Sequence, residues 1–276
     1  MKKNYVLTIL LLLLFSCIEK KTQKLLILNV DDVGTSPDTI EGVIELYKNN
    51  SISSVSFMAF GEDFENSAAK LKEYKIPTGV HLALNHGSGV LPVKDVPSLH
   101  RPDGMLWNTV DETMSHLVLE EVRMEFEAQI KKLSDSGVRL THLDSHMGLV
   151  FNNQELLQIY IDLARKYNLA VALPASTYFD KTRKVLEESN LQASSSYDGI
   201  YDLHEENIKN RTDAYRKKIR RLSAGVNYMY SHPMPDRESV RKKYDDYNIR
   251  INDFSLFMSK EWKKMLKENN VELVSF

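Results

Sequence analysis

Residues 25–34 read LLILNVDDVG, an apolar run that ends in two adjacent acids and a glycine. Apolar residues at successive positions are typical of a parallel strand that is buried on both faces. The pair Asp31-Asp32 falls where such a strand would end. In sheets of parallel strands, active groups lie at the carboxyl ends of the strands. This stretch therefore predicts a buried first strand and indicates where a functional site should lie.

Strands and helices are expected to alternate along the rest of the chain. Apolar runs predict strands over 53–60, 78–84, 138–145, 169–173, 226–231 and 271–276. Helical spacing predicts helices over 37–48, 64–74, 114–133, 154–167, 205–222 and 260–267. Residues 85–110 are rich in Gly and Pro and read as a long functional loop, whereas 175–202 resist assignment. This alternation, over about 250 residues without a linker or repeat, predicts one α/β domain of (β/α)-barrel size.

The composition narrows the functional class. The 276 residues include 36 Lys and Arg against 38 Asp and Glu, a formal net charge of −2, with 42% apolar and 27% charged residues. These values fit a folded globular protein and disfavour disorder. A nearly neutral chain creates no field that attracts nucleic-acid phosphates. The single cysteine excludes a disulfide framework, and the single long apolar run excludes a multispan membrane protein.

The amino terminus reads as a secretion signal. A basic start precedes an apolar run over 5–15, which is shorter than the about 20 apolar residues that a spanning helix needs. Cys17 follows where a bacterial lipoprotein carries its lipidated cysteine, although an uncleaved anchor or a chance cysteine would give the same pattern. We expect a protein anchored by lipid in the cell envelope, on the periplasmic face or the cell surface. The expected parts are a signal peptide over 1–16, a tether over 17–23 with lipidated Cys17, and a single catalytic domain over 24–276.

The adjacent acids Asp31 and Asp32 favour a cation. Two carboxylates in one site repel each other unless one is protonated or neutralised. A divalent metal ion can bind one of them and leave the other free as a base. The alternative is that the acids cap the following helix, although Asp38 could already favour that helix start.

Histidines near other predicted strand ends favour the same interpretation. His142, Asp144 and His146 alternate along one strand, so they share a face while the strand stays extended. Polar groups on an apolar strand need partners when buried. His81, taken alone, is more often a hydrogen-bonded core residue than a ligand. His232 could protonate a leaving group, or could simply be a turn residue before a proline.

These residues lie in motifs that resemble those of the YdjC-like carbohydrate deacetylases, which include chitooligosaccharide deacetylase. Residues 28–34, Leu-Asn-Val-Asp-Asp-Val-Gly, resemble the family's Asn-Ala-Asp-Asp-Phe-Gly signature. Residues 79–84 are similar to its Gly-x-His-Leu-x-Leu strand, and residues 141–146 match its Thr-His-Leu-Asp-Ser-His strand at every position. Residues 231–233 are similar to its Cys-His-Pro. The motifs occur in family order, and the resemblance covers about residues 24–276.

The resemblance implies a (β/α)-barrel-like fold of the glycoside hydrolase and deacetylase type. It also implies an enzyme that uses one divalent metal ion, Zn²⁺ or Mg²⁺, to hydrolyse the N-acetyl group of an amino sugar or oligosaccharide. By this resemblance Asp32, His81 and His146 would hold the metal.

The resemblance implies roles for four further residues. Asp31 would be the base that activates water, and His232 the general acid. His142 and Asp144 would orient the metal ligands, as such sites require.

The sequence departs from the family pattern around the pocket. Val33 replaces a phenylalanine, and residues 147–150 replace histidines that often follow His146. Residues 172–174 lack an arginine commonly found there. These changes leave the implied metal ligands intact but alter the wall of the pocket. They therefore affect which substrate is expected, and not the expected chemistry. Two alternatives remain, a catalytically silent glycan-binding lipoprotein and a different metal-dependent barrel enzyme such as a sugar isomerase.

Overall fold

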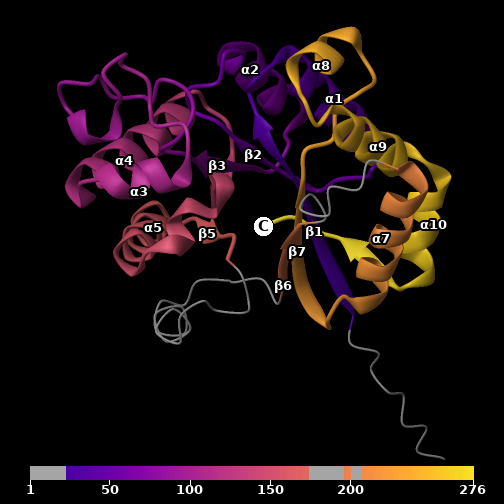
Figure 1. The fold of residues 1–276 in the computed structure, drawn as a ribbon. Coiled ribbons are helices and arrows are strands. Elements are labelled where there is room, and N and C mark those ends of the chain that lie inside the picture. Colours follow the sequence, from indigo (N-terminus) through magenta and orange to yellow (C-terminus); the bar gives the residue numbers. More distant parts are fainter. Residues whose placement is uncertain (1–22, 174–195, 200–206) are drawn as a thin grey trace, which may run out of the picture.

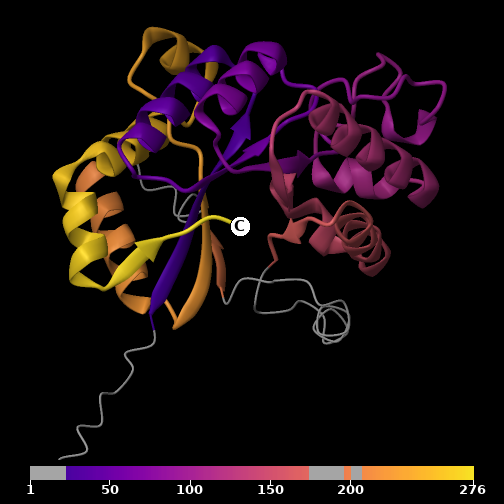
Figure 2. The same ribbon diagram turned by 180° about the vertical axis from the view of Figure 1, so that it is seen from behind.

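The computed structural model describes residues 23–173, 196–199 and 207–276. Its strands form one sheet in the order β5-β4-β3-β2-β1-β7-β6, with β8 paired to the start of β1, and every described pairing is parallel. The sheet curls with helices outside it, which confirms the predicted barrel-like α/β fold (Figures 1 and 2). The strands are β1 (Lys24–Val33), β2 (Ser54–Phe57), β3 (Thr78–Leu82), β4 (Leu140–Ser145), β5 (Ala170–Val171), β6 (Ser196–Gly199), β7 (Gly225–Ser231) and β8 (Val271–Leu273).

The described helices cover the two halves of the sheet separately. Helices α3, α4 and α5 lie beside the β3–β5 half, and α7, α9 and α10 lie beside the β1–β7 half (Figure 1). The α-helices are α1 (Pro37–Lys48), α2 (Phe64–Tyr74), α3 (Val110–His116), α4 (Leu119–Asp135), α5 (Gln154–Tyr167), α7 (Ile208–Arg221), α8 (Glu238–Lys243), α9 (Tyr247–Met258) and α10 (Lys260–Glu268). The 3₁₀ turns in the described ranges are η1 (Pro97–Leu99) and η2 (His146–Asn152).

Two helix predictions need correction. The segment predicted as one helix over 114–133 is two helices, because the chain becomes extended at Leu117 and Val118. Thr109 starts the first of them with a reciprocal capping box to Glu112, a signal that the periodicity argument overlooked. Helices α8 and α9 were not predicted. In α9, buried Asp253 interrupts the apolar pattern that would have marked it.

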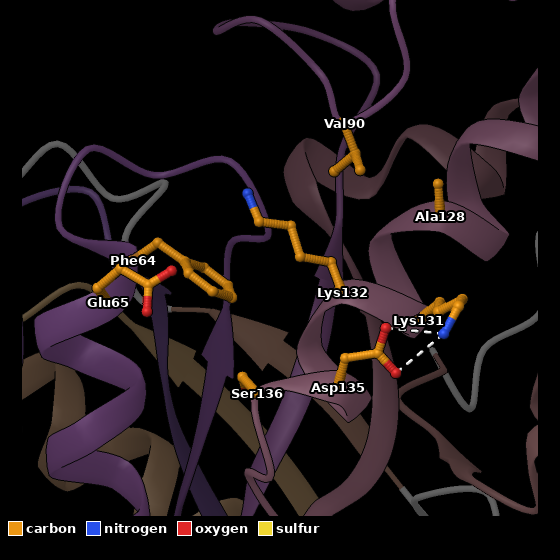
Figure 3. Close-up of a pocket in the computed structure, with 8 residues that line it drawn as sticks. All are labelled: Phe64, Glu65, Val90, Ala128, Lys131, Lys132, Asp135 and Ser136. Atoms are coloured by element: carbon orange, nitrogen blue, oxygen red, sulfur yellow. Dashed lines mark hydrogen bonds and ion pairs between the residues drawn. The ribbon is translucent and has the colours of Figure 1, made fainter.

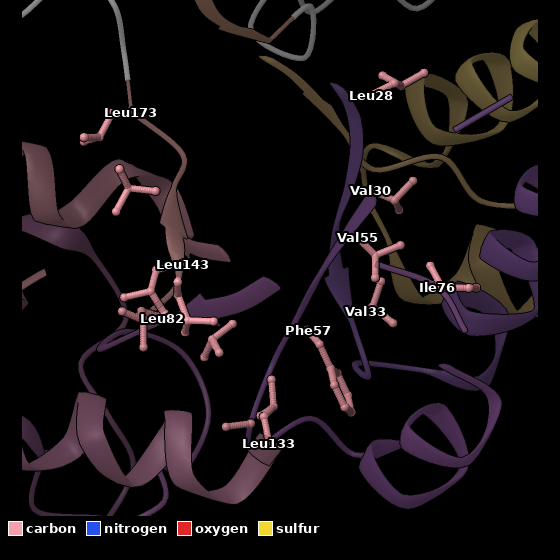
Figure 4. Close-up of a cluster of buried hydrophobic side chains, with 14 of the residues drawn as sticks. Leu28, Val30, Val33, Val55, Phe57, Ile76, Leu82, Leu133, Leu143 and Leu173 are labelled. Atoms are coloured by element: carbon pink, nitrogen blue, oxygen red, sulfur yellow. The ribbon is translucent and has the colours of Figure 1, made fainter. Parts of the chain in front are cut away.

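Apolar side chains from the sheet and helices form one main core. Figure 4 shows Val30, Val55 and Phe57 among the buried side chains of this core. All three are fully buried, and burying such a side chain typically contributes about 1.5–3 kcal/mol. Phe57 also stacks on Phe64 of α2, with ring centroids 4.9 Å apart. This packing fixes the positions of β1 and β2. The placement of Asp31 and Asp32, at the end of β1, depends on the pairing of these two strands.

The long loop after β3 is tied to α4 by buried polar side chains. Glu125 accepts hydrogen bonds from the backbone N–H groups of Val90 and Leu91, at 2.8 and 2.9 Å. Gln129, one turn further along α4, bonds both backbone groups of Ala83, just past β3. The loop is therefore anchored at its start, where it passes the carboxyl edge of the sheet.

Some predictions fall outside the described residues. The predicted signal peptide over 1–16 and Cys17 lie there, as does most of the unassigned segment 175–202. Within the described ranges, no helix has the length and apolar character needed to cross a membrane.

Candidate active site

A β-bulge at the end of β1 brings two adjacent acids to one site. Pairing with β2 advances from Val30 opposite Val55 to Val33 opposite Phe57, so β1 has one extra residue here. In a regular strand, adjacent side chains point to opposite faces. Asp32 instead adopts a left-handed backbone, with φ of 60°, which Asp tolerates better than most residues. The bulge therefore lets both Asp31 and Asp32 contribute to the same cluster.

Neither acid serves as the cap of the following helix. Ser36 is the N-cap of α1, and its side chain accepts from the backbone N–H of Thr39 at 3.3 Å. The alternative explanation for the acid pair is therefore wrong. Both carboxylates remain available to the site at the sheet edge.

Asp32, His81 and His146 form a compact triangle of ligand atoms. Asp32 Oδ1 lies 3.3 Å from His81 Nε2 and 3.2 Å from His146 Nδ1. The two ring nitrogens are 3.2 Å apart. Asp32 Oδ1 is buried, yet neither nitrogen makes a well-formed hydrogen bond to it. Three atoms that can donate electron pairs thus face one another at short range.

This triangle has the dimensions of a metal site. Ligand atoms bound at about 2.0–2.1 Å in a tetrahedron are about 3.3–3.4 Å apart. The observed separations of 3.2–3.3 Å match that edge length. The His81 side chain is only 2% exposed, whereas Asp32 and His146 are 16% and 14% exposed, so the cluster opens to solvent on one side. Two imidazoles, one carboxylate and an open side suit a catalytic metal ion.

A second carboxylate fixes the orientation of His81. Asp144 Oδ2 lies 3.2 Å from His81 Nδ1, opposite the nitrogen that faces Asp32. Asp144 Oδ2 also accepts from Ser56 Oγ at 2.9 Å and from the Tyr228 hydroxyl at 3.1 Å. Burial would raise the pKa of Asp144, but the hydrogen bond and charge of His81 outweigh burial and lower it to about 2. Asp144 therefore stays ionised and is already committed to hydrogen bonds.

His142 lies on β4, whereas His146 lies directly after it. His142 and Asp144 both contact Ser56, so they share a face of β4 as predicted. His146 lies just past the strand, at the start of η2, where Met147 adopts a φ of 51°. Ser145 before it is still extended, with φ of −121° and ψ of 113°, so the chain turns only after His146.

His142 is a buried residue beneath the cluster. Its Nδ1 lies 2.9 Å from Thr141 Oγ1, and its Nε2 lies 3.4 Å from Ser56 Oγ. The ring stacks on Phe276 at 4.0 Å between centroids. Both ribbon views place this end of the chain between the two halves of the sheet (Figures 1 and 2). Burial lowers the pKa of His142 to about 3, so the ring is neutral and supports its neighbours through contacts rather than charge.

Asp31 is a buried carboxyl group beside the triangle. It is 5% exposed and accepts a 2.7 Å hydrogen bond from Asn29 Nδ2. One of its oxygens lies within 4.8 Å of ligand atoms of both His81 and Asp144. Burial, followed by the charge of Asp144, raises the pKa of Asp31 well above its ordinary value. A carboxyl group in this environment binds a proton more readily than a solvated one.

The His232 ring lies near the second carboxylate oxygen of Asp32. Its Nε2 lies 3.6 Å from Asp32 Oδ2. Burial lowers the pKa of His232 to about 4, so the ring is neutral near neutral pH. By contrast, the pKa of Asp32 is held well below its ordinary value, because contacts from His146, His232 and His81 outweigh burial. His232 thus adds a further imidazole to the cluster.

A buried network holds the end of β7 just before His232. Ser231 Oγ donates to Asp253 Oδ2 at 2.6 Å, and Tyr215 donates to the same oxygen at 2.9 Å. Arg211 and Asp253, each 1% exposed, form a bidentate ion pair. Such a pair is costly to break when one partner is removed. The position of His232 is therefore set by α7 and α9 as well as by its own strand.

The structure brings together all seven chemical groups predicted for the site and adds others. Ser56 and Asn29 bond to each other and to Asp144 and Asp31 respectively. The sequence does not single out Tyr228, yet its hydroxyl donates to Asp144 at 3.1 Å. The signal for Ser56 was available, because small polar residues recur in the otherwise apolar and buried β2.

A separate surface depression lies between α2 and α4. It has a volume of about 520 Å³ and is lined by Phe64, Lys132 and Val90 among others (Figure 3). Lys132 lies over the Phe64 ring, and Lys131 pairs with Asp135 on the helix surface. Its lining residues include none of the clustered acids and histidines.

Comparisons with known proteins identify relatives of this chain. A family model described as YdjC-like protein matches residues 25–268. A protein of Thermoanaerobacter pseudethanolicus named carbohydrate deacetylase is 26% identical over 255 residues, covering 92% of this chain and 98% of its own. One of the same name from Enterococcus faecalis is 27% identical over 262 residues, with the same coverage.

A solved structure is similar over the same range. It is an Enterococcus faecalis protein provisionally described as a cellobiose-phosphate cleavage protein. The two chains are 25% identical with a TM-score of 0.78, covering 92% of this chain and 97% of the other. The likeness therefore extends over most of both chains.

Proposed function

The chain belongs to the YdjC-like family, and from this membership and the site geometry we propose that it hydrolyses the N-acetyl group of an amino sugar or oligosaccharide. Relatives named carbohydrate deacetylase are aligned over nearly their full length. They support a carbohydrate substrate and a deacetylation reaction. The observation that carries the proposal is the triangle of Asp32, His81 and His146, flanked by Asp31 and His232.

We propose that Asp32, His81 and His146 hold one divalent metal ion. A metal ion bound there would act as a Lewis acid on the acetamide carbonyl and would lower the pKa of water. The two imidazoles and one carboxylate favour zinc, while magnesium prefers oxygen ligands. The separations of 3.2–3.3 Å also support a tetrahedral ion.

Asp31 is suited to take a proton from the attacking water. Its carboxyl group lies beside the triangle without being part of it, and its raised pKa favours proton uptake. Asn29 keeps the acceptor in place through the 2.7 Å hydrogen bond. Asp31 is thus the proposed base.

His232 is suited to deliver a proton to the leaving nitrogen. Water adds to the carbonyl carbon, the C–N bond breaks, and the nitrogen must gain a proton to leave as an amine. The low pKa of His232 means that its ring starts neutral. It would therefore first accept a proton, in balance the one that Asp31 takes from the attacking water, and then donate it to the leaving nitrogen. Asp32, 3.6 Å away, would stabilise the imidazolium that forms.

Acetate release tests this proposal. The full chain, purified in mild detergent, would be assayed against N-acetylglucosamine and its short β-1,4 oligomers, without metal, with zinc and with magnesium. We expect acetate only when a metal ion is added, and a loss of at least about 100-fold in kcat for Asp31→Asn, the usual effect of removing a general base. Metal-independent acetate, or full activity in the variant, would contradict the proposal.

We also propose that the protein is lipid-anchored through Cys17 in the cell envelope. The support is in the sequence, where an apolar run over residues 5–15 precedes the single cysteine. Partition of the full chain into a detergent phase, lost in Cys17→Ser, tests this assignment. A wild-type chain that stays in the aqueous phase would contradict it.

A further inference from the structure

A large apolar side chain is exposed directly beside a candidate metal ligand. Met147 follows His146, and 57% of its surface is exposed. Its backbone φ of 51° is in the left-handed region, which a residue with a β-carbon rarely adopts. Strained backbone of this kind clusters at functional sites. The position of Met147 is therefore not explained by core packing.

A side chain from the neighbouring strand end holds Met147 in place. Asn85, which is fully buried, donates from Nδ2 to the Met147 sulfur at 2.9 Å. Asn85 is itself fixed by a β-bridge to Trp107 in the long loop. The thioether is thus oriented by β3 and its loop, although it belongs to the turn after β4.

The imidazole of His86 also lies close to His146. His86 also has a left-handed backbone, with φ of 59°, and its ring lies edge-on to His146 at 6.1 Å between centroids. Its backbone N–H donates to Trp107 at 2.9 Å, so its position is fixed. Met147 and His86 therefore both lie beside the same ligand, His146, on two loops that the Asn85–Met147 hydrogen bond connects.

We propose that Met147 determines substrate specificity by contacting the apolar C–H face of the sugar ring that carries the acetamide. This inference rests on the proposed function. The cluster itself offers carboxylates and imidazoles, which suit the amide and the hydroxyl groups. A pyranose ring also has an apolar face, and a flexible, polarisable thioether can adapt to it. Covering the exposed side chain with that face would be favourable.

The contact predicts an effect on binding more than on chemistry. Met147 touches no group proposed to move a proton, so its loss should weaken substrate and transition state alike, which raises KM and leaves kcat nearly unchanged. Met147→Ala keeps the β-carbon and hence the same backbone preference. Met147→Leu keeps an apolar side chain, and Met147→Gln keeps the length but adds polarity. Met124→Ala, at another exposed methionine on α4, is the matched control.

Steady-state kinetics with N,N′-diacetylchitobiose, together with metal content, test the proposal on the full chain. We expect KM to rise about tenfold in Met147→Ala and Met147→Gln, with kcat within about twofold of wild type. Met147→Leu and Met124→Ala should resemble wild type, and all variants should bind the same amount of metal. An unchanged KM, or a loss of metal in Met147→Ala, would overturn the proposal.

Saturation-transfer NMR separates this inference from the proposed function. If the wild type releases no acetate from any N-acetylated sugar, the deacetylase proposal fails by itself. Transfer from protein methyl groups to the ring C–H protons of diacetylchitobiose, lost in Met147→Ala, would still support the contact. Transfer that persists in the variant, or no binding by the wild type, would overturn it.

Discussion

His81 Nδ1 lies 3.2 Å from Asp144 Oδ2, and the two residues are direct register partners on the adjacent strands β3 and β4. Because Asp144 stays ionised, it favours a proton on Nδ1 and leaves Nε2 to face Asp32. A carboxylate behind a histidine is a common device for orienting a metal ligand. The register between β3 and β4 therefore leaves the electron pair of His81 Nε2 facing the candidate metal site.

Replacing Asp144 by Asn should weaken metal binding without removing a ligand. The amide has no charge to hold the proton on His81 Nδ1, and loss of such a partner typically costs 10–100-fold in metal affinity, roughly the effect expected here. Isothermal titration with zinc measures this. Asp162→Asn, which removes a surface carboxylate paired with Arg123, is the control. Equal affinity in Asp144→Asn and wild type would show that Asp144 does not orient His81.

Metal binding should weaken as the pH falls. Burial would lower the pKa of His81, but its hydrogen bond to Asp144 and its close contact with the Asp32 carboxylate outweigh burial and raise it well above 6.5. A proton on Nε2 competes with the metal ion, so affinity should fall about tenfold per pH unit below that raised pKa. Zinc titrations between pH 6 and 8, in buffers of different ionisation enthalpy, should reveal proton release. Affinity that does not change over this range would contradict the assignment of His81.

In the metal-free protein, the contribution of His81 to stability should have the opposite pH dependence to metal affinity. It should be largest at acidic pH. A histidine whose folded pKa is raised stabilises the fold below its unfolded pKa, and this contribution is lost as the pH rises through the folded pKa. In EDTA, His81 should therefore stabilise the protein at acidic pH. His81→Gln should remove this dependence, and an unaltered pH profile in that variant would exclude His81 as its source.

Asp31 and Asp32 should affect the metal-free protein in opposite directions. The raised pKa of Asp31 means that its ionised form destabilises the fold, so Asp31→Asn should raise Tm at pH 8. This gain should vanish at acidic pH, where Asp31 is protonated. The lowered pKa of Asp32 means that its ionised form stabilises the fold above about pH 4, so Asp32→Asn should lower Tm at pH 8. Each kcal/mol corresponds to about 2–4 °C in a chain of this size. Thermal melts in EDTA would contradict this if both variants shifted Tm in the same direction.

Gly79 provides the space for His142. A β-carbon on Gly79 would lie 2.3 Å from His142 Nε2, far inside contact distance. Gly79→Ala should therefore destabilise the fold by about 1–3 kcal/mol, as overpacking usually does. Urea denaturation measures the loss. In a Gly79→Ala/His142→Ala double variant the new methyl group has space, so the two effects should not add. Strict additivity would show that the ring is not the obstacle.

The sequence was sufficient for the parts of the site that follow strand geometry. Asp31, His81 and His142 lie on strands whose apolar character marks them, and parallel strands end at one edge. The helix over 154–167 was predicted with its observed bounds, because its apolar face is strongly periodic and Asn153 caps it. In these places, local pattern and tertiary packing agree.

Local backbone departures could not be predicted in this way. The bulge that turns Asp32 toward His81 depends on the register between β1 and β2, and the strand pattern of β1 does not encode it. The left-handed turn at Met147, directly after His146, is likewise not marked by the strand pattern. Tyr228 has an apolar ring suited to packing, and only the fold places its hydroxyl beside Asp144.

The central claim is that one acid of the pair binds the metal and the other acts as the base. Zinc content and acetate release, measured on the same preparations of Asp31→Asn and Asp32→Asn, test it most directly. We predict that Asp31→Asn retains one zinc ion per chain, as in wild type, but releases acetate from N-acetylglucosamine oligomers at least about 100-fold more slowly. Asp32→Asn should lose both. Equal zinc content in the two variants, or acetate release by Asp31→Asn at the wild-type rate, would contradict this division of roles.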